Sequence, residues 1–491
     1  MRNATPFFAA FGPLLFGRPP RSFRAELRAK AAHAHSLCEL RAAFGAMIPD
    51  ALLAPAREGA GSRRRIYSSL ITFWAFLSQV LSPDSACREA VRKVQAWWML
   101  LHDEEISPDS SAYCQARARL SDQAMLGIHA HLSERMEANA PEQERWHSRN
   151  VKIVDGTTAS MLDTPENQAA YPQPSSQKKG CGFPILKLVA IFSLASGALL
   201  HFVRNNLHIH ESLLFRQLWS LLQAGDVVLA DRGFCSFVTM ASLLARSVDS
   251  VMRLHQARGA DFRHGKYLGK DDRLIAWAKP QQRPAAWSKE DFAALPATLP
   301  LRLIRLRVEA CGFRTKTIIV VTTLLDVELY PADAIRALYL DRWTVELHFR
   351  EIKTLLGLDV LRCLTPAMIE KELILQVIAY NLVRSLMQHA SLRHRVCLER
   401  LSFKGTLDTL RHFAEVVQAA NGRPRKQAQL LDGMLEIIAA DQIPDRPNRS
   451  EPRAKKRRPK NYHLLTKPRH QMGNLPHRNR PGQRRPKSAL S

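Results

Sequence analysis

The sequence lacks the cysteine patterns that bind zinc or cross-link secreted domains. Its eight cysteines are scattered, and no two of them form a Cys-x-x-Cys pair. This scatter excludes a zinc ribbon and a disulfide framework, and it favours a reducing cytoplasm. The chain also contains no G-x-x-x-x-G-K-[ST] loop and no Gly-x-Ser-x-Gly elbow. We therefore expect no nucleotide cofactor and no serine-hydrolase chemistry.

Long uninterrupted apolar runs are missing as well. The apolar stretch 6–16 is interrupted by Pro6, Gly12 and Pro13, which argues against a signal peptide. The stretch 185–202 contains Lys187 and several small residues, so it predicts buried strands and not a membrane span. We expect no membrane partner.

Acidic residues are few relative to basic ones. The 491 residues include 71 Lys and Arg but only 45 Asp and Glu, a formal net charge of +26. Such an excess favours a polyanionic partner, and nucleic acid is the first candidate. A ribosomal or nucleoid-type binding protein without catalytic chemistry would show the same balance. Charge alone therefore does not separate an enzyme from a binding protein.

The first part of the chain predicts a helical domain. From residue 22 to about 148, apolar residues recur at helical spacing in segments separated by Pro83, Pro108 and Pro141. Two basic runs in this part, Arg63–Arg65 and 113–120, are candidates for contact with DNA. A solvated helix face is the alternative for both runs.

After residue 148 the apolar pattern changes to that of an α/β sheet. Short apolar strands alternate with two helices, the first at Glu211–Gln223, which predicts a mixed sheet. Strand-like segments at 256–325 indicate a β-rich insertion, and a helix is expected from about Ala332 to Leu356 with Gly357 as its C-cap. Residues 446–491 contain fifteen Lys or Arg, one acid and seven prolines. Such a tail is expected to be disordered until it meets an anion.

Two aspartates follow predicted strands of this sheet. Asp155 ends the apolar segment 151–155, and Asp231 ends the segment 225–231; each is followed by turn residues. Ligand sites of α/β sheets gather at strand ends. Either residue alone is as well explained as a turn former. Two such ends together predict a shared site.

A polar stripe on the predicted helix supplies a third carboxylate. Tyr339, Arg342, Glu346 and Lys353 project within about 60° of one another at 100° per residue. A carboxylate beside a phenol, a guanidinium and an ammonium suits one metal ion and a nearby phosphate. A salt-bridge ladder on the helix surface is the alternative interpretation of this stripe.

The three carboxylates together predict a site for hard cations. Asp155, Asp231 and Glu346 cannot all stay ionised side by side without positive charge nearby. Oxygen ligands of this kind suit Mg²⁺ or Mn²⁺, and two ions about 3.5–4 Å apart would serve phosphodiester chemistry. We therefore predict two ions at this site.

These residues resemble a known family. Asp155 in VDGTT, Asp231 in LADRGF and the Tyr-x2-Arg-x3-Glu-x6-Lys spacing are similar to the DDE transposases of bacterial insertion sequences. They match the cut-and-paste group with the YREK signature, over roughly residues 30–460. The resemblance implies an RNase H-like catalytic core, a mixed sheet with flanking helices, interrupted by the β-rich insertion and preceded by the helical N-terminal domain.

The resemblance also implies roles for the site residues. Asp155 would bridge the two metal ions, Asp231 and Glu346 would each hold one, and three residues would bind DNA phosphates: Tyr339, Arg342 and Lys353. Aromatic residues of the insertion, Trp277 or Trp287, would stack on an unpaired base, although packing in the core or a loop is the alternative for both. The sequence His208-Ile-His210-Glu211 lacks the later Asp and His of an H-x-H-x-D-H site, so we do not assign it a zinc ion.

The resulting hypothesis is a transposase that binds double-stranded DNA. Its DNA would be the terminal inverted repeats and the target, a homodimer would act in the DNA complex, and the protein would be cytoplasmic and nucleoid-associated. Two alternatives stay open: an RNase H-fold nuclease without strand transfer, and a transposase-derived DNA-binding protein that does not cut. The predicted limits are 1–21 for a leader, 22–148 for the helical domain, 149–255 for the first part of the core, 256–325 for the insertion, 326–440 for the end of the core with the C-terminal helices, and 441–491 for the basic tail.

Overall fold

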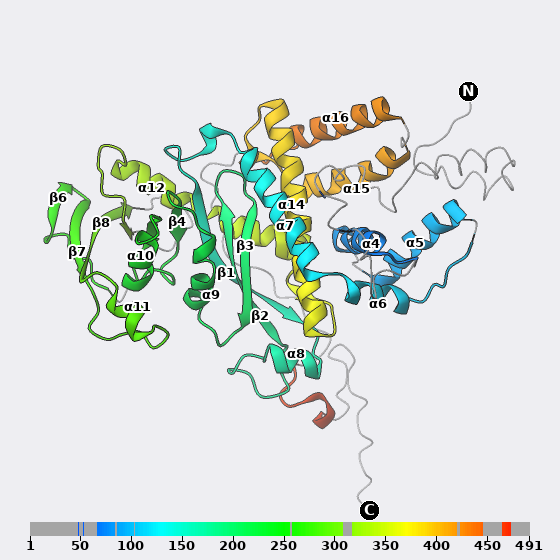
Figure 1. Cartoon of the computed structure of the whole chain (residues 1–491), viewed down its shortest axis with the longest axis horizontal. Helices are drawn as coiled ribbons and strands as arrows, with labels where there is room; N and C mark the ends of the chain where they lie inside the picture. The colour runs from blue at the N-terminus through cyan, green and yellow to red at the C-terminus, as the bar shows by residue number, and fades with distance from the viewer. Residues whose placement is uncertain are drawn as a thin grey trace, which may run out of the picture. The chain divides into compact units, whose positions relative to one another are not determined.

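The structure is a computed structural model, shown in Figure 1. It describes residues 48, 53, 66–83, 86–102, 104–255, 258–307, 317–419, 423–444 and 464–472. The predicted leader, Arg63–Arg65 and most of the basic tail lie outside these residues. The chain divides into two compact units: one combines Met1–Leu132 with Ile374–Ile443, and the other combines Ser133–Leu373 with Pro444–Ser491. These units divide the chain at points that differ from the predicted domain limits.

The first unit is helical in all of its described regular structure apart from an isolated β-bridge. Its helices are α4 (Ser69–Leu81), α5 (Cys87–His102), α6 (Ser111–Arg119), the first part of α7 (Asp122–Ala138), most of α14 (Pro366–His394), the 3-10 turn η5 (Leu398–Arg400), α15 (Phe403–Ala419) and α16 (Pro424–Ala440). Ser68 caps α4 by accepting a hydrogen bond from the Ile71 N–H. Tyr113 is buried in the core of α4–α6, and its hydroxyl donates to Gln79 Oε1 at 2.7 Å.

Arg117 of α6 does not present its charge to solvent. It is 7% exposed, and its guanidinium lies 4.7 Å from the centroid of the Phe76 ring and 5.1 Å from that of Tyr113. This cation–π packing holds the side chain inside the helical unit. The expectation that the whole basic segment 113–120 faces DNA or water is therefore wrong for Arg117.

The second unit is built on one mixed sheet. Its strand order is β3-β2-β1-β4-β5-β9-β8-β7-β6, and β10 pairs with the far end of β1. The strands are β1 (Val151–Met161), β2 (Ile185–Ser193), β3 (Leu199–Asn206), β4 (Val227–Ala230), β5 (Asp249–Arg253), β6 (Lys266–Gly269), β7 (Asp272–Ala278), β8 (Thr298–Arg307), β9 (Thr317–Thr322) and β10 (Val360–Leu361). Strand β2 is almost entirely buried, as its near-continuous apolar run requires.

The relative directions of the paired strands define the fold class of the core. β1 pairs antiparallel with β2, and β2 with β3, whereas β1 pairs parallel with β4 and β4 with β5. Three antiparallel strands followed by two parallel ones form the RNase H-like arrangement, so the predicted fold class is confirmed.

The predicted β-rich insertion extends the same sheet. β9 pairs antiparallel with β5, and β8, β7 and β6 continue outward from it, as Figure 1 shows. Arg302 of β8 is fully buried, pairs with Asp272 of β7, and donates to the Tyr330 carbonyl at 2.7 Å. This buried guanidinium ties the added strands to the loop that leads into the next helix.

Short helices cover the sheet. α9 contacts β2 and β3, α10 contacts β5, α12 contacts β5 and β8, and α13 contacts β1. The helical segments of this unit are α8 (Pro165–Ala170), α9 (Glu211–Gln217), α10 (Phe237–Leu244), α11 (Lys289–Ala293), α12 (Ala332–Asp341), α13 (Thr344–Arg350), the π-helical η4 (Glu351–Leu355) and the 3-10 turns η2 (Glu142–Glu144), η3 (Trp219–Leu221) and η6 (Arg469–Gln471).

The expectation of one α-helix from Ala332 to Leu356 is wrong. Between α12 and α13 the helical turns tighten to a 3-10 pattern. There, N–H groups donate to carbonyls three residues back at Arg342, Trp343, Val345 and Glu346. The helix then widens into η4, which is π-helical. The segment ends at Gly357, whose φ of 84° is the left-handed conformation expected of a C-cap.

Among the described residues, no helix is long and apolar enough to cross a membrane. Part of the predicted tail, 464–472, is described and contains η6. There the Pro468 ring lies so close to Gly180 that a side chain at that glycine would contact it at 3.0 Å.

Candidate active site

Asp155 lies in the interior of β1, so the expectation that it ends a strand is wrong. β1 continues to Met161 because β2 pairs with it along its whole length, as far as Ser160. The parallel neighbour β4 is shorter and ends at Ala230, opposite Val154. Asp155 is therefore the first residue of β1 beyond the end of β4.

The strand register brings the two predicted aspartates together. Asp231 follows Ala230 directly, and one step beyond the last register pair it stands next to Asp155. Both carboxylates are oriented by local backbone groups: the Gly156 N–H donates to Asp155 Oδ1 at 2.8 Å, and the Gly233 N–H donates to Asp231 Oδ1 at 2.7 Å. These contacts fix both side chains at one edge of the sheet.

The irregular helix brings the third carboxylate to the same place through Arg342. The guanidinium lies 3.6 Å from Asp155 Oδ2 through Nη1 and 3.6 Å from Glu346 Oε1 through Nη2. Arg342 is almost buried, whereas the Glu346 side chain is 61% exposed. One positive charge thus stands between a carboxylate of the sheet and a carboxylate of the helix.

The surroundings of Asp155 favour its neutral form. Burial raises the pKa of Asp155 to about 6, although the hydrogen bond from Gly156 and the charge of Arg342 oppose this rise. The negative charges of Asp231 and Glu211 also raise this pKa. The positive charge of Arg342 therefore does not fully offset the burial of Asp155 and the negative charges around it.

The other two residues of the predicted stripe occupy different environments. Tyr339 is 1% exposed, and burial raises its pKa to about 12. Lys353 lies in η4, where its Nζ donates to Thr157 Oγ1 at 3.3 Å and lies 3.4 Å from an Asp359 carboxylate oxygen. Thr157 shares a face of β1 with Asp155, so Lys353 lies on the face of the strand that carries the carboxylate.

The donor atoms suit a divalent cation, but they are not gathered around one. Within the described residues, no three His, Cys, Asp or Glu side chains are close enough to hold a metal ion. The Arg342 guanidinium, between Asp155 and Glu346, fills the role of the cation there. The carboxylate oxygens themselves are the ligands that Mg²⁺ and Mn²⁺ prefer.

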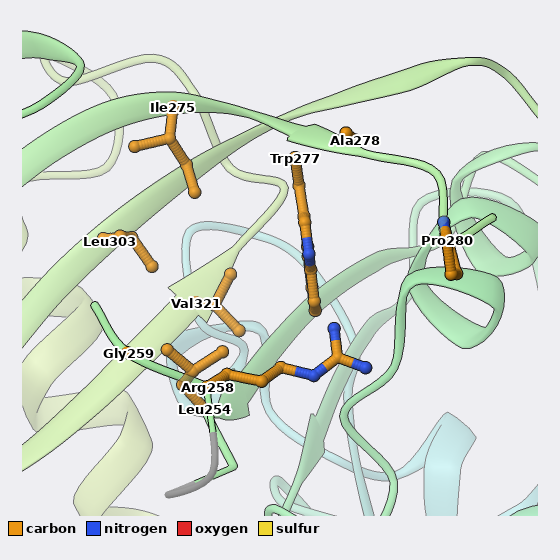
Figure 2. A pocket seen from close by; sticks show the side chains of 9 residues that line it. All are labelled: Leu254, Arg258, Gly259, Ile275, Trp277, Ala278, Pro280, Leu303 and Val321. Carbon is orange, nitrogen blue, oxygen red and sulfur yellow. The ribbon is translucent and has the colours of Figure 1, made fainter. Parts of the chain in front are cut away.

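The two tryptophans of the insertion differ in accessibility. Trp277 lines a pocket of about 390 Å³ together with Arg258, Leu254 and the apolar residues Ile275, Leu303 and Val321. Figure 2 shows the Trp277 ring and the Arg258 guanidinium next to each other in this pocket, and the guanidinium lies 4.6 Å from the ring centroid.

Trp287, in contrast, is packed. It is 8% exposed, lies against Trp219 with 6.1 Å between ring centroids, and has the Arg216 guanidinium 4.3 Å above its ring. Trp277 therefore borders a pocket, whereas protein groups cover Trp287.

The buried Cys235 follows Asp231 closely in the sequence. Burial raises the pKa of its thiol to about 12; the charge of Arg258 lowers this pKa and that of Asp231 raises it.

Three residues of this region were not found from the sequence. Arg258 and Arg302 lie in segments that show only a strand pattern and a loop, and neither burial nor pocket lining is visible there. Glu211 was considered only with His208 and His210 as a metal-binding run. His210 instead caps α9, where its Nδ1 accepts a hydrogen bond from the Ser212 N–H at 3.2 Å.

Comparison with known proteins relates the chain to transposases. Residues 146–382 match the family described as the transposase DDE domain. Over 405 residues the chain is 26% identical to the transposase InsG for insertion sequence element IS4 of Escherichia coli (strain K12), which covers 82% of this chain and 88% of the relative. A cryo-EM structure of a piggyBac transposase synaptic complex with hairpin DNA is similar at a TM-score of 0.41 and 10% identity, over 78% of each chain.

The matched domain and the relationship over most of the chain identify the protein as a transposase. Within that class it is similar to the transposase of the insertion sequence element IS4.

Proposed function

We propose that this transposase binds the ends of an insertion sequence, cleaves the DNA there and joins the freed 3′-hydroxyl to a target. Asp155, Asp231 and Glu346 are the catalytic carboxylates. The proposal rests above all on one observation: Asp155 and Asp231 directly follow the last paired residues of β1 and β4, and Arg342 links Asp155 to Glu346.

The carboxylates would hold two divalent cations, Mg²⁺ or Mn²⁺. The site fits such ions because its donors are carboxylate oxygens and because the Arg342 guanidinium already stands where a positive charge is needed. Bound cations would activate the attacking hydroxyl and stabilise the leaving oxygen of the phosphodiester. Asp155 would contact both ions, and Asp231 and Glu346 one each. The Gly156 and Gly233 N–H groups hold Asp155 and Asp231 ready for this task.

Arg342 and Lys353 would bind the phosphates of the DNA end. Once cations neutralise the carboxylates, the Arg342 guanidinium becomes available to a phosphate. Lys353 lies on the face of β1 that carries Asp155 and therefore next to the reacting phosphate. Tyr339 is buried, so we assign it to orienting Arg342, whose guanidinium carbon lies 5.9 Å from its ring centroid.

Trp277 would receive an unpaired base of the DNA end. The pocket offers a ring face, a guanidinium and apolar walls, which suit stacking of a base. Trp287 lacks such a space and is assigned to packing.

The DNA partner follows from charge and class together. A net charge of +26 suits the phosphates of terminal repeats and target. Two copies of the chain would act in the DNA complex, each on one end of the element.

Incubation of the full-length protein with the flanking DNA ends and Mg²⁺ tests this function. We expect strand breaks at the element ends and joints to a second DNA, with both lost in Asp155→Asn, Asp231→Asn and Glu346→Gln. Glu166→Gln is the control, because Glu166 is an exposed first-turn carboxylate of α8. Breaks without joints would identify a nuclease, and binding without breaks would identify a DNA-binding protein that does not cut.

A further inference from the structure

Two segments that are distant in the sequence meet near the far end of β1. The loop 172–184 leads from α8 into β2, and the tail segment 464–472 lies against it. A Cβ atom built on Gly180 would lie 3.0 Å from Cγ and 3.3 Å from Cβ of Pro468. Glycine at this position permits both the close approach and the left-handed backbone, whose φ is 76°. Both segments belong to the same compact unit.

One side-chain amide gives the loop a fixed backbone. Gln173 Nε2 donates to the Gln177 carbonyl at 3.1 Å and to the Lys178 carbonyl at 2.9 Å. Its Oε1 accepts hydrogen bonds from the Gly180 N–H at 2.9 Å and from the Gly182 N–H at 3.3 Å. A loop whose backbone is already ordered loses little conformational entropy when it binds a partner.

The contact between the two segments gathers positive charge. Lys178 and Lys179 precede Gly180 in the loop, Lys467 and Arg469 flank Pro468 in the tail segment, and all four cationic side chains are exposed. Neither segment contains an Asp or a Glu. Among the residues that the structure describes, none of these four cations forms an ion pair. Like charges brought together without a counter-charge repel one another, so the surface favours an anionic partner.

The strand β1 connects this surface with the candidate site. Asp155 lies in β1, which ends at Met161, and the Met161 N–H donates to the Pro184 carbonyl at 3.1 Å, where the loop returns to the sheet. At about 3.3 Å per residue, the end of the loop lies roughly 20 Å from Asp155. A DNA duplex rises about 3.4 Å per base pair, so this distance corresponds to about six base pairs. A duplex that is cleaved at Asp155 and follows β1 therefore reaches the cationic surface.

We propose that the loop 172–184 and the tail segment 464–472 form one surface, the loop–tail surface, that binds the phosphate backbone of double-stranded DNA about six base pairs from the cleaved phosphate. This rests on the proposed function, because cleavage at Asp155 sets the place of the duplex. Phosphate contacts position a duplex and do not read its sequence. The loop–tail surface thus holds the DNA in place whatever bases lie there.

Salt titrations of the full-length protein with a duplex that carries one end of the element measure these contacts. The double variant Lys178→Ala, Lys179→Ala should lower the slope of log affinity against log salt by about two. Lys467→Ala with Arg469→Ala should lower it by about the same amount, since each phosphate contact contributes about 0.9 to the slope for B-DNA.

A second pair of neighbouring cations provides the matched control. Arg425 and Lys426 are exposed residues of α16 in the other compact unit, and Arg425→Ala with Lys426→Ala should leave the slope unchanged. An equal fall in this control would show that affinity follows net charge alone, and it would overturn the loop–tail surface.

The wild type distinguishes failure of this proposal from failure of the proposed function. If the wild type binds the duplex and both double variants of the loop–tail surface keep its slope, the loop–tail surface is overturned and the proposed function stands. If the wild type does not bind the duplex, the proposed function itself is overturned.

Interference by phosphate ethylation tests the position of the surface. Ethylation about six base pairs from the cleaved phosphate should weaken binding of the wild type. In both double variants this interference should disappear at the same phosphates. Loss at two separate positions would show that loop and tail bind DNA independently, which overturns the single surface. Interference that persists in both variants would assign the cations to another anionic partner, such as an acidic protein.

Discussion

The sheet and the helical segment that carry the candidate carboxylates differ in rigidity. Asp155 stands on β1 and Asp231 directly follows the neighbouring parallel strand β4, and each carboxylate is held by a backbone N–H within two residues of it. Glu346 stands on a helical segment that tightens before it and widens after it, and its side chain is 61% exposed. The strands therefore supply a preorganised pair, and the helix supplies a carboxylate that can still adjust its position.

This difference has a physical reason. Strand partners fix β1 and β4 through hydrogen bonds on both sides, so their ends cannot move separately. Irregular turns within helices occur frequently at functional sites, where they re-aim side chains. We infer that the sheet sets the place of the reaction, and that the α12–α13 segment, with η4, completes the site around it.

Changes of side-chain length should have the largest and most unequal effects. Asp155→Glu and Asp231→Glu should reduce DNA cleavage more than about a hundred-fold, because the fixed strands cannot make room for a further methylene. Glu346→Asp should retain measurable cleavage, because the exposed helical segment can move toward the site. Cleavage rates with Mg²⁺ and with Mn²⁺ measure both effects. Equal losses in all three variants would contradict the contrast between sheet and helix.

The burial of Asp155 predicts how stability depends on pH without metal. Its folded pKa of about 6 exceeds its ordinary value of 3.8, so its contribution to stability is fully present below about pH 4 and is lost as pH rises through 6. Between pH 4 and pH 7.5 the free energy of unfolding of Asp155→Asn should therefore rise relative to that of the wild type by on the order of 3 kcal/mol.

Denaturant unfolding in EDTA at several pH values measures this gain. Glu346→Gln is the comparison, because its side chain is mostly exposed and should show little of the effect. Parallel pH curves for Asp155→Asn and the wild type would show that the carboxylate is solvated after all. Adding Mg²⁺ should reduce the difference, since the ion neutralises the charge.

Phosphate binding by the helical segment should show a smaller effect. Arg342→Ala and Lys353→Ala should each lower the slope of log affinity against log salt by about one for pre-cleaved DNA ends. Strand joining should fall more than metal binding. Salt titrations together with a joining assay test this; an unchanged slope and unchanged joining would leave the stripe as a salt-bridge ladder.

Tyr339→Phe should have the smallest effect. It removes one buried hydroxyl near Arg342, a change worth about 1 kcal/mol. Affinity for pre-cleaved ends should fall less than in Arg342→Ala, with the salt slope unchanged. A loss as large as that of Arg342→Ala would assign Tyr339 to direct phosphate contact.

The sequence predicts the sheet well where local pattern decides. The apolar segments before Asp155 and Asp231 form strands, and the order of elements indicates a mixed α/β sheet; the RNase H-like core was implied by the family resemblance. The length of β1 was not predictable, because its second half is stabilised by pairing with β2, which is distant in the sequence. The break after α12 was not predictable either, since the apolar period continues through it.

Side-chain environments were harder to predict than elements. The sequence predicts that Arg117 is a solvated basic residue, but in the structure its guanidinium packs against Phe76 and Tyr113. The spacing of Tyr339, Arg342, Glu346 and Lys353 was visible, but a uniform helix does not describe their unequal exposure.

The pairing of β9 with β5 joins the insertion and the core in one continuous sheet. Strand β4, which Asp231 follows, and strand β7, which carries Trp277, are four strand spacings apart, roughly 19 Å across the sheet. If Trp277 receives a base of the DNA end, the continuous sheet fixes the distance between that base and the carboxylates. The cut would then fall at a constant number of nucleotides from the stacked base, whatever sequence lies between them.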